Sequence, residues 1–229
     1  MVADFILTIL AAGFTTLLLA LASVAVATAL GLVAAFCKLS RSRALRMTAQ
    51  IYTFVVRGIP DLVVMLLIFY SVPSLLNQLA ENMGLDVHIE FSPFIAGIAT
   101  LGLIFGAYMT ETFKTALINI PKGQIEAAVA YGLSQRRLFT RIVLPQMIRL
   151  ALPGFTNNWL VLVKATALVS LIGLQDVMFR AKGAAEATGK PFTFYLVAAG
   201  FYLAITIISM LGLIAIAKRY DVGTRELAQ

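Results

Sequence analysis

Cysteine and histidine are almost absent from this chain, since each occurs once, as Cys37 and His88. A single cysteine excludes an intramolecular disulfide and any cluster of cysteine metal ligands. A single histidine with no cysteine beside it does not make a zinc ligand set, so we predict no metal site. The sequence also shows no serine, histidine and aspartate set and no paired carboxylates, and these absences argue against an enzyme.

Charged residues are scarce as well. They make up 13% of the 229 residues, whereas hydrophobic residues make up 60%. A soluble domain has roughly 25% charged and 45–50% apolar residues, so the composition predicts an integral membrane protein. The net charge of +7 would suggest nucleic-acid binding in a soluble protein. Here the basic residues gather in particular loops, which membrane topology explains better, and no nucleic-acid partner is expected.

Five segments carry hydrophobic side chains with little or no charge, and crossing a bilayer takes about 20 residues of helix. They are residues 5–37, 62–80, 91–110, 150–175 and 192–217. Unpaired backbone groups are costly in lipid, so all five are predicted to be helices. The first segment is longer than one span and is expected to tilt or to bend near Gly13 or Gly31. In the third, Gly97, Gly102 and Gly106 are spaced to let helices approach closely.

The basic residues lie on alternate sides of these spans. Apart from Arg57, which lies close to span two, thirteen lysines and arginines fall in the loops after spans one and three and in the C-terminal tail, against three in the other two loops. The basic side of a membrane protein faces the cytoplasm, so the N-terminus is predicted outside and the C-terminus inside. No repeat or low-complexity linker divides the sequence, and we expect one membrane domain over residues 1–229.

The longest polar interval, residues 114–149, lies on the predicted cytoplasmic side. Residues 123–131 predict a short helix that begins after Pro121 and ends at Gly132, a glycine placed for a left-handed cap. Ser134 is positioned to cap a second helix, which is expected to stop at Leu144 and Pro145. The alanines of the first helix favour close docking of another protein. A helix that rests on the bilayer surface is the alternative.

This interval resembles the EAA loop of ABC importer permeases. The residues that match are Glu126, Ala127, Ala128, Gly132, Ile142, Leu144 and Pro145, and Gly123 belongs to the same loop helix. In that family the loop helix sits in a cleft of the ATPase subunit. The resemblance therefore implies that these residues couple the chain to an ATP-binding subunit dimer. It also implies an all-α fold, the five-helix transmembrane domain of a type I ABC importer, in the bacterial inner membrane.

Three further stretches resemble the polar amino acid branch of the family. They are Arg57-Gly58-Ile59-Pro60, residues 107–113, and Asn157-Asn158-Trp159 followed by residues 164–168. The likeness is strongest to the membrane subunits of histidine and lysine/arginine/ornithine or opine importers. It implies a second homologous permease subunit and a periplasmic solute-binding protein as partners, in addition to membrane lipid.

Span four is the most polar of the five, because it contains Asn157, Asn158, Lys164 and Thr166. Ionisable side chains within a bilayer are costly and usually functional, so this span is the predicted wall of the translocation path. Lys164 either binds a substrate carboxylate or pairs within the protein, and the sequence leaves both alternatives open. Glu111, near the cytoplasmic end of span three, is the other predicted path residue.

Arg57, Pro60 and Asp61 lie at the cytoplasmic start of span two and form a predicted gate or structural ion pair. A pair between Arg57 and Glu111 fits the expected topology. The glycine and proline in this stretch would kink a helix or begin one, as a hinge or as a simple turn.

The chain lacks the glycine-rich phosphate loop that ends in Lys-Ser or Lys-Thr, so ATP hydrolysis must fall to a partner subunit. We expect no cofactor on this chain, and ATP with magnesium on the partner. The features together predict a permease subunit, not an enzyme, of an ATP-driven importer of polar, cationic amino acids. An ion-coupled secondary transporter or a channel is the alternative, although the spans lack the mid-membrane acids that ion coupling uses. The sequence leaves open which amino acid is carried and whether the companion permease is a copy or a paralogue.

Overall fold

The five expected membrane spans are present in the computed structural model, which describes residues 2–85 and 87–220. Within these residues the elements are helical. The spans are α1 with α2 (Val2–Ala11 and Gly13–Leu39), α4 with η1 and α5 (Asp61–Leu66, Leu67–Ser71 and Val72–Asn82), α6 (Pro93–Ile118), α8 with η2, α9 and η3 (Gln135–Leu138, Phe139–Val143, Leu144–Ala165 and Thr166–Ile172), and α11 (Pro191–Tyr220). Asp86 and Arg225, which entered the charge count, lie outside the described residues, as does the side chain of Arg219.

The helix of the first span is divided into two parts where α1 meets α2. The helix is interrupted at Ala12, and Gly13 begins α2, whereas Gly31 lies inside the uninterrupted part of α2. A Cβ atom added to Gly13 would lie 2.4 Å from Cε2 of Phe201, so α11 packs against this position too closely for a side chain. The helix is thus interrupted next to Gly13, one of the two positions named for a bend, and not at Gly31, while the bend itself stays a prediction.

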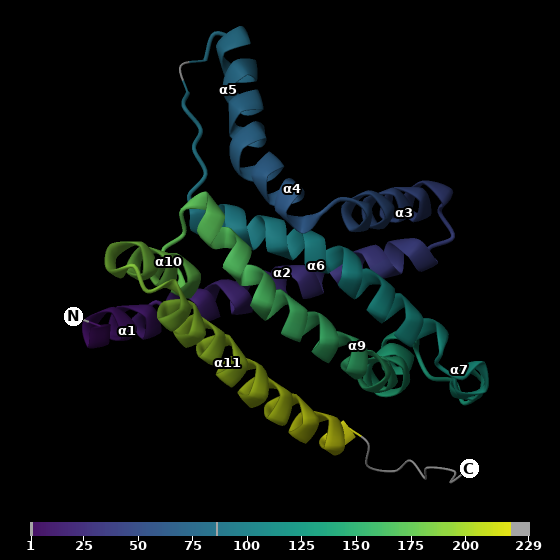
Figure 1. Cartoon of the computed structure of the whole chain (residues 1–229). Helices are drawn as coiled ribbons and strands as arrows, with labels where there is room; N and C mark the ends of the chain where they lie inside the picture. Colours follow the sequence, from purple (N-terminus) through teal and green to yellow (C-terminus); the bar gives the residue numbers. More distant parts are fainter. Residues whose placement is uncertain (1, 86, 221–229) are drawn as a thin grey trace.

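Helices α2 and α6 form the centre of the domain (Figure 1). They run parallel, because contacts occur in the same order along both helices. A Cβ atom added to Gly102 would lie 2.5 Å from Cγ1 of Val26, and one added to Gly31 would lie 2.5 Å from Cβ of Met109. Gly97 and Gly106 are approached almost as closely. The predicted glycine-mediated helix contact is confirmed, and it brings the two backbones close enough for extensive packing.

The helix expected to stop at Leu144 and Pro145 instead continues into span four, so that prediction is wrong. The π-helical turn η2 ends at Val143 and Pro145 follows in the first turn of α9. A proline ring collides with the carbonyl group one turn earlier in a regular helix, and a widened turn relieves this collision. The same arrangement occurs in span two, where the π-helical turn η1 is followed by Pro73.

Two helices were not expected. α3 (Arg43–Gly58) follows α2 and packs against α6, where the Tyr52 hydroxyl group donates a hydrogen bond of 2.6 Å to the Leu103 carbonyl oxygen. α10 (Val177–Thr188) lies between spans four and five, and its first backbone N–H group donates to the hydroxyl oxygen of Thr16 on α2 at 3.3 Å. Sequence reasoning treated both stretches as loops because it followed their charges rather than their apolar periodicity.

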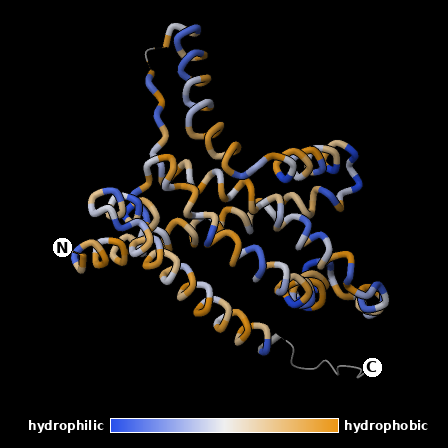
Figure 2. The backbone as a smooth tube through the Cα atoms, viewed as in Figure 1, coloured by the Kyte–Doolittle hydropathy of each residue, from blue (hydrophilic) through white to orange (hydrophobic). Residues whose placement is uncertain are grey.

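Much of the apolar surface is uncovered in this single chain. Helices α4 and α5 lean away from the other spans in Figure 1, and in Figure 2 α11 and the lower part of the leaning segment, at α4, are rich in hydrophobic residues, whereas its upper turns are more polar. In α11, the 18-residue stretch that represents its apolar part has no buried residue. In the corresponding stretch of α6, 61% of the residues are buried. In a bilayer such surface faces lipid or another subunit. The N-terminus and α7 (Lys122–Ala130) lie at opposite ends of the molecule (Figure 1).

Candidate coupling helix and translocation path

The short helix α7 is joined firmly to the end of α6. The connection consists of residues 119–121, and Ile120 within it is 3% exposed. The Asn119 side chain donates to the Thr115 carbonyl oxygen at 2.9 Å and closes the last turn of α6. Pro121 then precedes α7, where its missing N–H group costs nothing, as predicted. α7 is therefore attached to α6 by a short connection that contains a buried residue.

Gly132 ends α7 with the predicted left-handed cap. Its φ angle is +74°, a conformation that a side chain disfavours. The backbone N–H group of Leu133 donates to the Ala128 carbonyl oxygen at 3.1 Å, and that of Gly132 donates to Val129 at 2.9 Å. This is the Schellman arrangement, which satisfies the last carbonyl groups of the helix and fixes its length.

The outer face of α7 is small and open. Gly123, Glu126 and Ala127 are exposed, and no atom lies within 4 Å of the place where a Gly123 side chain would begin. Ala128 differs, because it is 7% exposed and packs inward against its own chain. The prediction that Ala128 offers docking space is therefore corrected: its small side chain lets α7 lie close to α8 and η2.

A side-chain contact braces α7 against span four. The amide of Gln146 donates to the Gln124 side-chain oxygen at 2.7 Å and to the Ile142 carbonyl oxygen at 2.9 Å. Leu144 packs against the hydrophobic core, while Pro145 is exposed in the first turn of α9. α7 is thus linked to α6 by the chain and to α9 by a hydrogen bond.

The polar residues of span four divide between two faces. Asn157, Val161 and Lys164 are exposed along one face of α9, as their spacing predicts. Asn158 turns inward, where its amide donates to the Thr112 hydroxyl oxygen at 3.1 Å. Thr166 is fully buried. Asn157 and Lys164 therefore lie on the uncovered face, whereas Asn158 and Thr166 do not, and the role of span four as the wall of the path stays a prediction.

Glu111 has different partners from those expected. Its carboxylate pairs with Lys38 at the end of α2 and lies 3.7 Å from the Lys114 ammonium group. The Arg57 guanidinium group instead lies 5.2 Å from the ring centre of Tyr108, in position for a cation–π contact. α3 brings Arg57 over the ring of Tyr108, which lies one helical turn before Glu111 on α6. This cation–π contact takes the place of the expected Arg57–Glu111 pair. Lys38 was missed, since its sequence position resembles that of any basic loop residue.

The stretch around Pro60 interrupts the chain between two helices. α3 ends at Gly58, Ile59 is extended as expected for a residue before proline, and α4 begins at Asp61. Asp61 is half-buried in the first turn of α4, where the helix dipole favours a carboxylate. The predicted helix break is confirmed. Its action as a gate stays a prediction.

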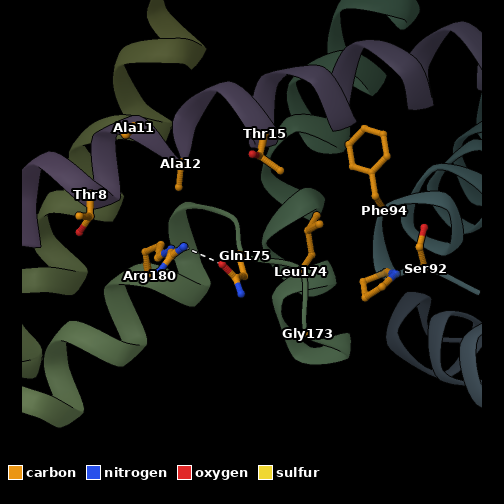
Figure 3. A pocket seen from close by; sticks show the side chains of 11 residues that line it. Thr8, Ala11, Ala12, Thr15, Ser92, Phe94, Gly173, Leu174, Gln175 and Arg180 are labelled. Carbon is orange, nitrogen blue, oxygen red and sulfur yellow. Dashed lines mark hydrogen bonds between the residues drawn. The ribbon is translucent and has the colours of Figure 1, made fainter.

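A cavity of about 590 Å³ lies at the end of the molecule opposite to α7, beside the junction of α1 and α2. Figure 3 shows Arg180 of α10 beside it, with its guanidinium group donating to the Gln175 side-chain oxygen at 2.6 Å. The hydroxyl groups of Thr8, Thr15 and Ser92 also line the cavity. Among the described residues, no cluster of histidine, cysteine and acidic side chains could hold a metal ion.

Next to this cavity, Asp176 caps α10 by accepting a hydrogen bond of 2.8 Å from the Phe179 backbone N–H group. Its side chain is fully buried, and its second carboxylate oxygen has no hydrogen-bond partner. Burial raises the pKa of Asp176 to about 6, although the hydrogen bonds from the backbone oppose this shift. The carboxyl group therefore changes charge close to neutral pH.

Comparison with known proteins agrees with these features. The sequence model of the family described as the binding-protein-dependent transport system inner membrane component matches residues 27–222. The chain is 47% identical over 218 residues to the histidine/lysine/arginine/ornithine transport system permease protein HisQ of Salmonella typhimurium, with 95% of each chain covered. It is 40% identical over 220 residues to the arginine ABC transporter permease protein ArtQ of Haemophilus influenzae, with 96% of each covered.

Solved structures of ABC transporters contain chains with a similar fold. A chain from the crystal structure of an amino acid ABC transporter with histidines superposes with a TM-score of 0.80 and 26% identity, covering 95% of this chain and 96% of that one. A chain of the inward-facing MetNI methionine ABC transporter shares the fold, with a TM-score of 0.73 and 18% identity over 95% of this chain and 97% of that one. The chain therefore belongs to the family of binding-protein-dependent inner-membrane transport components, as a multi-pass permease subunit of the polar amino acid type.

Proposed function

We propose that this chain is one of two permease subunits of an ATP-driven importer of cationic amino acids. A periplasmic binding protein delivers the substrate, and an ATPase dimer that holds ATP and magnesium supplies the energy. The relatives described above, which transport histidine, lysine, arginine and ornithine, support this substrate class. The observation that carries the proposal is α7, an exposed helix with a firm attachment and a defined end.

The geometry of α7 suits a coupling role. Its outward face carries Glu126 and small side chains, so a partner cleft can approach the backbone closely. The cap at Gly132 and the contact between Gln124 and Gln146 hold the helix in one position relative to α6 and α9. A rigid element that two spans share transmits motion, because packed contacts switch between discrete arrangements and do not deform continuously.

The uncovered face of α9 supports a path between this chain and its companion. Asn157 and Lys164 would be costly against lipid, so they face water or protein in the assembled transporter. A lysine repels a cationic side chain but attracts the carboxylate that every amino acid carries. The chain alone therefore does not form a complete site for a cationic substrate, and the companion subunit completes it.

The same elements support an orientation in the membrane. Lys38, Lys114 and Lys122 lie toward the end that carries α7, and the predicted cytoplasmic loops meet there. We place this end in the cytoplasm, where the ATPase works, and the end with α10 and the cavity beside Arg180 outside the cell.

Co-purification with the ATPase subunit tests the proposal. Glu126→Lys reverses one charge on the exposed face of α7 and is expected to abolish capture of the ATPase by the tagged permease. Glu81→Lys makes the same change at an exposed position on α5 and serves as the matched control, with normal capture expected. Equal capture by both variants would refute docking on α7. Uptake by the chain alone without ATP would instead favour an ion-coupled transporter or a channel.

A further inference from the structure

Lys38 lies buried near the end of the membrane domain from which α7 emerges. It belongs to the last turn of α2, its side chain is 8% exposed, and its ammonium group donates a hydrogen bond to the Glu111 carboxylate of α6. A buried charge without a partner is costly, so the position of Lys38 depends on this carboxylate.

Two lysines form ion-pair contacts with Glu111 with different geometry, while Arg57 lies farther from the carboxylate and acts on it through its charge. Lys114 lies one turn further along α6, is about one-third exposed, and approaches the Oε2 atom of Glu111 at 3.7 Å. Lys38 approaches the Oε1 atom from a different helix. Of these two contacts, the one with Lys38 joins separate elements, while the one with Lys114 stays within α6.

The ion pair stands close to the coupling helix. Glu111 is two turns before the end of α6 at Ile118. A short connection that contains the buried Ile120 joins that end to α7. Further into the membrane, α2 and α6 are held by the close contact between Gly31 and Met109. Beyond this contact Ala35 of α2 is fully buried in the core that also contains Phe113 of α6, and the Lys38–Glu111 ion pair adds a polar contact between the last turn of α2 and α6.

We propose that the Lys38–Glu111 pair is the tie through which α6 moves the end of α2 when the ATPase displaces α7. This inference rests on the function proposed above. Lys38 and Glu111 are then positioning residues, which act on the arrangement of the spans and not on the substrate. The tie stays closed throughout the cycle, so that spans one and three move as one body.

The test uses the complete transporter in proteoliposomes with its binding protein, and it measures arginine uptake and ATP hydrolysis together. Lys38→Met removes the charge and keeps an apolar chain of similar length. We expect uptake per ATP hydrolysed to fall at least about fivefold, the low end of the range for coupling between distant sites. Lys114→Met removes a positive charge beside the same carboxylate but leaves the contact between α2 and α6 intact. Lys38→Arg keeps the charge at position 38. Both variants should therefore keep the wild-type ratio of uptake to ATP hydrolysed.

Glu111→Gln distinguishes the tie from a role in substrate binding. It should lower uptake per ATP as Lys38→Met does, with the KM for arginine unchanged. An unchanged ratio in Lys38→Met would overturn the proposal, and so would a raised KM in Glu111→Gln alone. Failure of both variants to assemble with the ATPase would assign the pair to folding and also overturn it. No ATP-driven uptake by the wild-type transporter would refute the proposed function itself, which is a separate result.

Discussion

Replacement of Gly132 by alanine should weaken docking of the ATPase without unfolding the permease. Gly132 has a φ angle of +74°, and its cap closes α7 with the hydrogen bond from Leu133 to Ala128. A Cβ atom in this conformation costs about 1–2 kcal/mol. No atom lies within 4 Å of the added Cβ, so strain is the expected effect and not a clash.

That strain sets the size of the effect. If the ATPase binds only the capped form of α7, a cost of 1–2 kcal/mol lowers the ratio of capped to uncapped α7 by a factor of about 5–30. The dissociation constant for the ATPase subunit should rise, by at most the same factor. The measurement is titration of nanodisc-embedded permease with the purified ATPase, and stimulation of ATP hydrolysis by the binding protein gives a second readout.

Gly84 provides the matched control. Its φ angle is +70°, no atom lies near the site of its Cβ, and it follows α5 rather than α7. Gly84→Ala therefore carries the same strain and should leave the affinity for the ATPase unchanged. Equal dissociation constants for the two variants would refute the reasoning, because the strain at Gly132 would then have no effect on docking.

Three further predictions concern packing, pH and the path. Gly102→Leu should lower the unfolding temperature sharply, because an added Cβ lies 2.5 Å from Val26, while Gly212→Leu, with open space around it, should not. Burial raises the pKa of Asp176 from 3.8 to about 6, so the folded state binds its proton more tightly. Stability should then fall by about 3 kcal/mol as the pH rises from about 4 to about 6, and Asp176→Asn should remove this slope in thermal unfolding. Lys164→Ala should raise the KM for arginine uptake, and an unchanged KM and rate would exclude a substrate role for this residue.

The sequence predicted those parts of the fold that depend on neighbouring residues. The five spans follow from hydrophobic length, and the end of α7 follows from the glycine at position 132, because a left-handed cap needs a residue without a side chain. The close contact at Gly102 also follows from spacing within one helix. In each of these cases the residues on which the prediction depends all lie within one segment.

Contacts between distant segments could not be predicted in the same way. Lys38 and Glu111 are 73 residues apart, and their pairing depends on the register of α2 against α6. The stop expected at Pro145 was wrong because a π-helical turn before the proline keeps the helix continuous. Asn158 turned inward because Thr112 lies opposite it on α6, which only the packed structure reveals.

Binding-protein-dependent uptake into proteoliposomes tests the central claim most directly. The chain, its companion permease and the ATPase would be reconstituted together, with labelled arginine and the binding protein outside and ATP inside. The account predicts that arginine accumulates only when ATP, the ATPase and the binding protein are all present. Accumulation by the permease chain without ATP would contradict it.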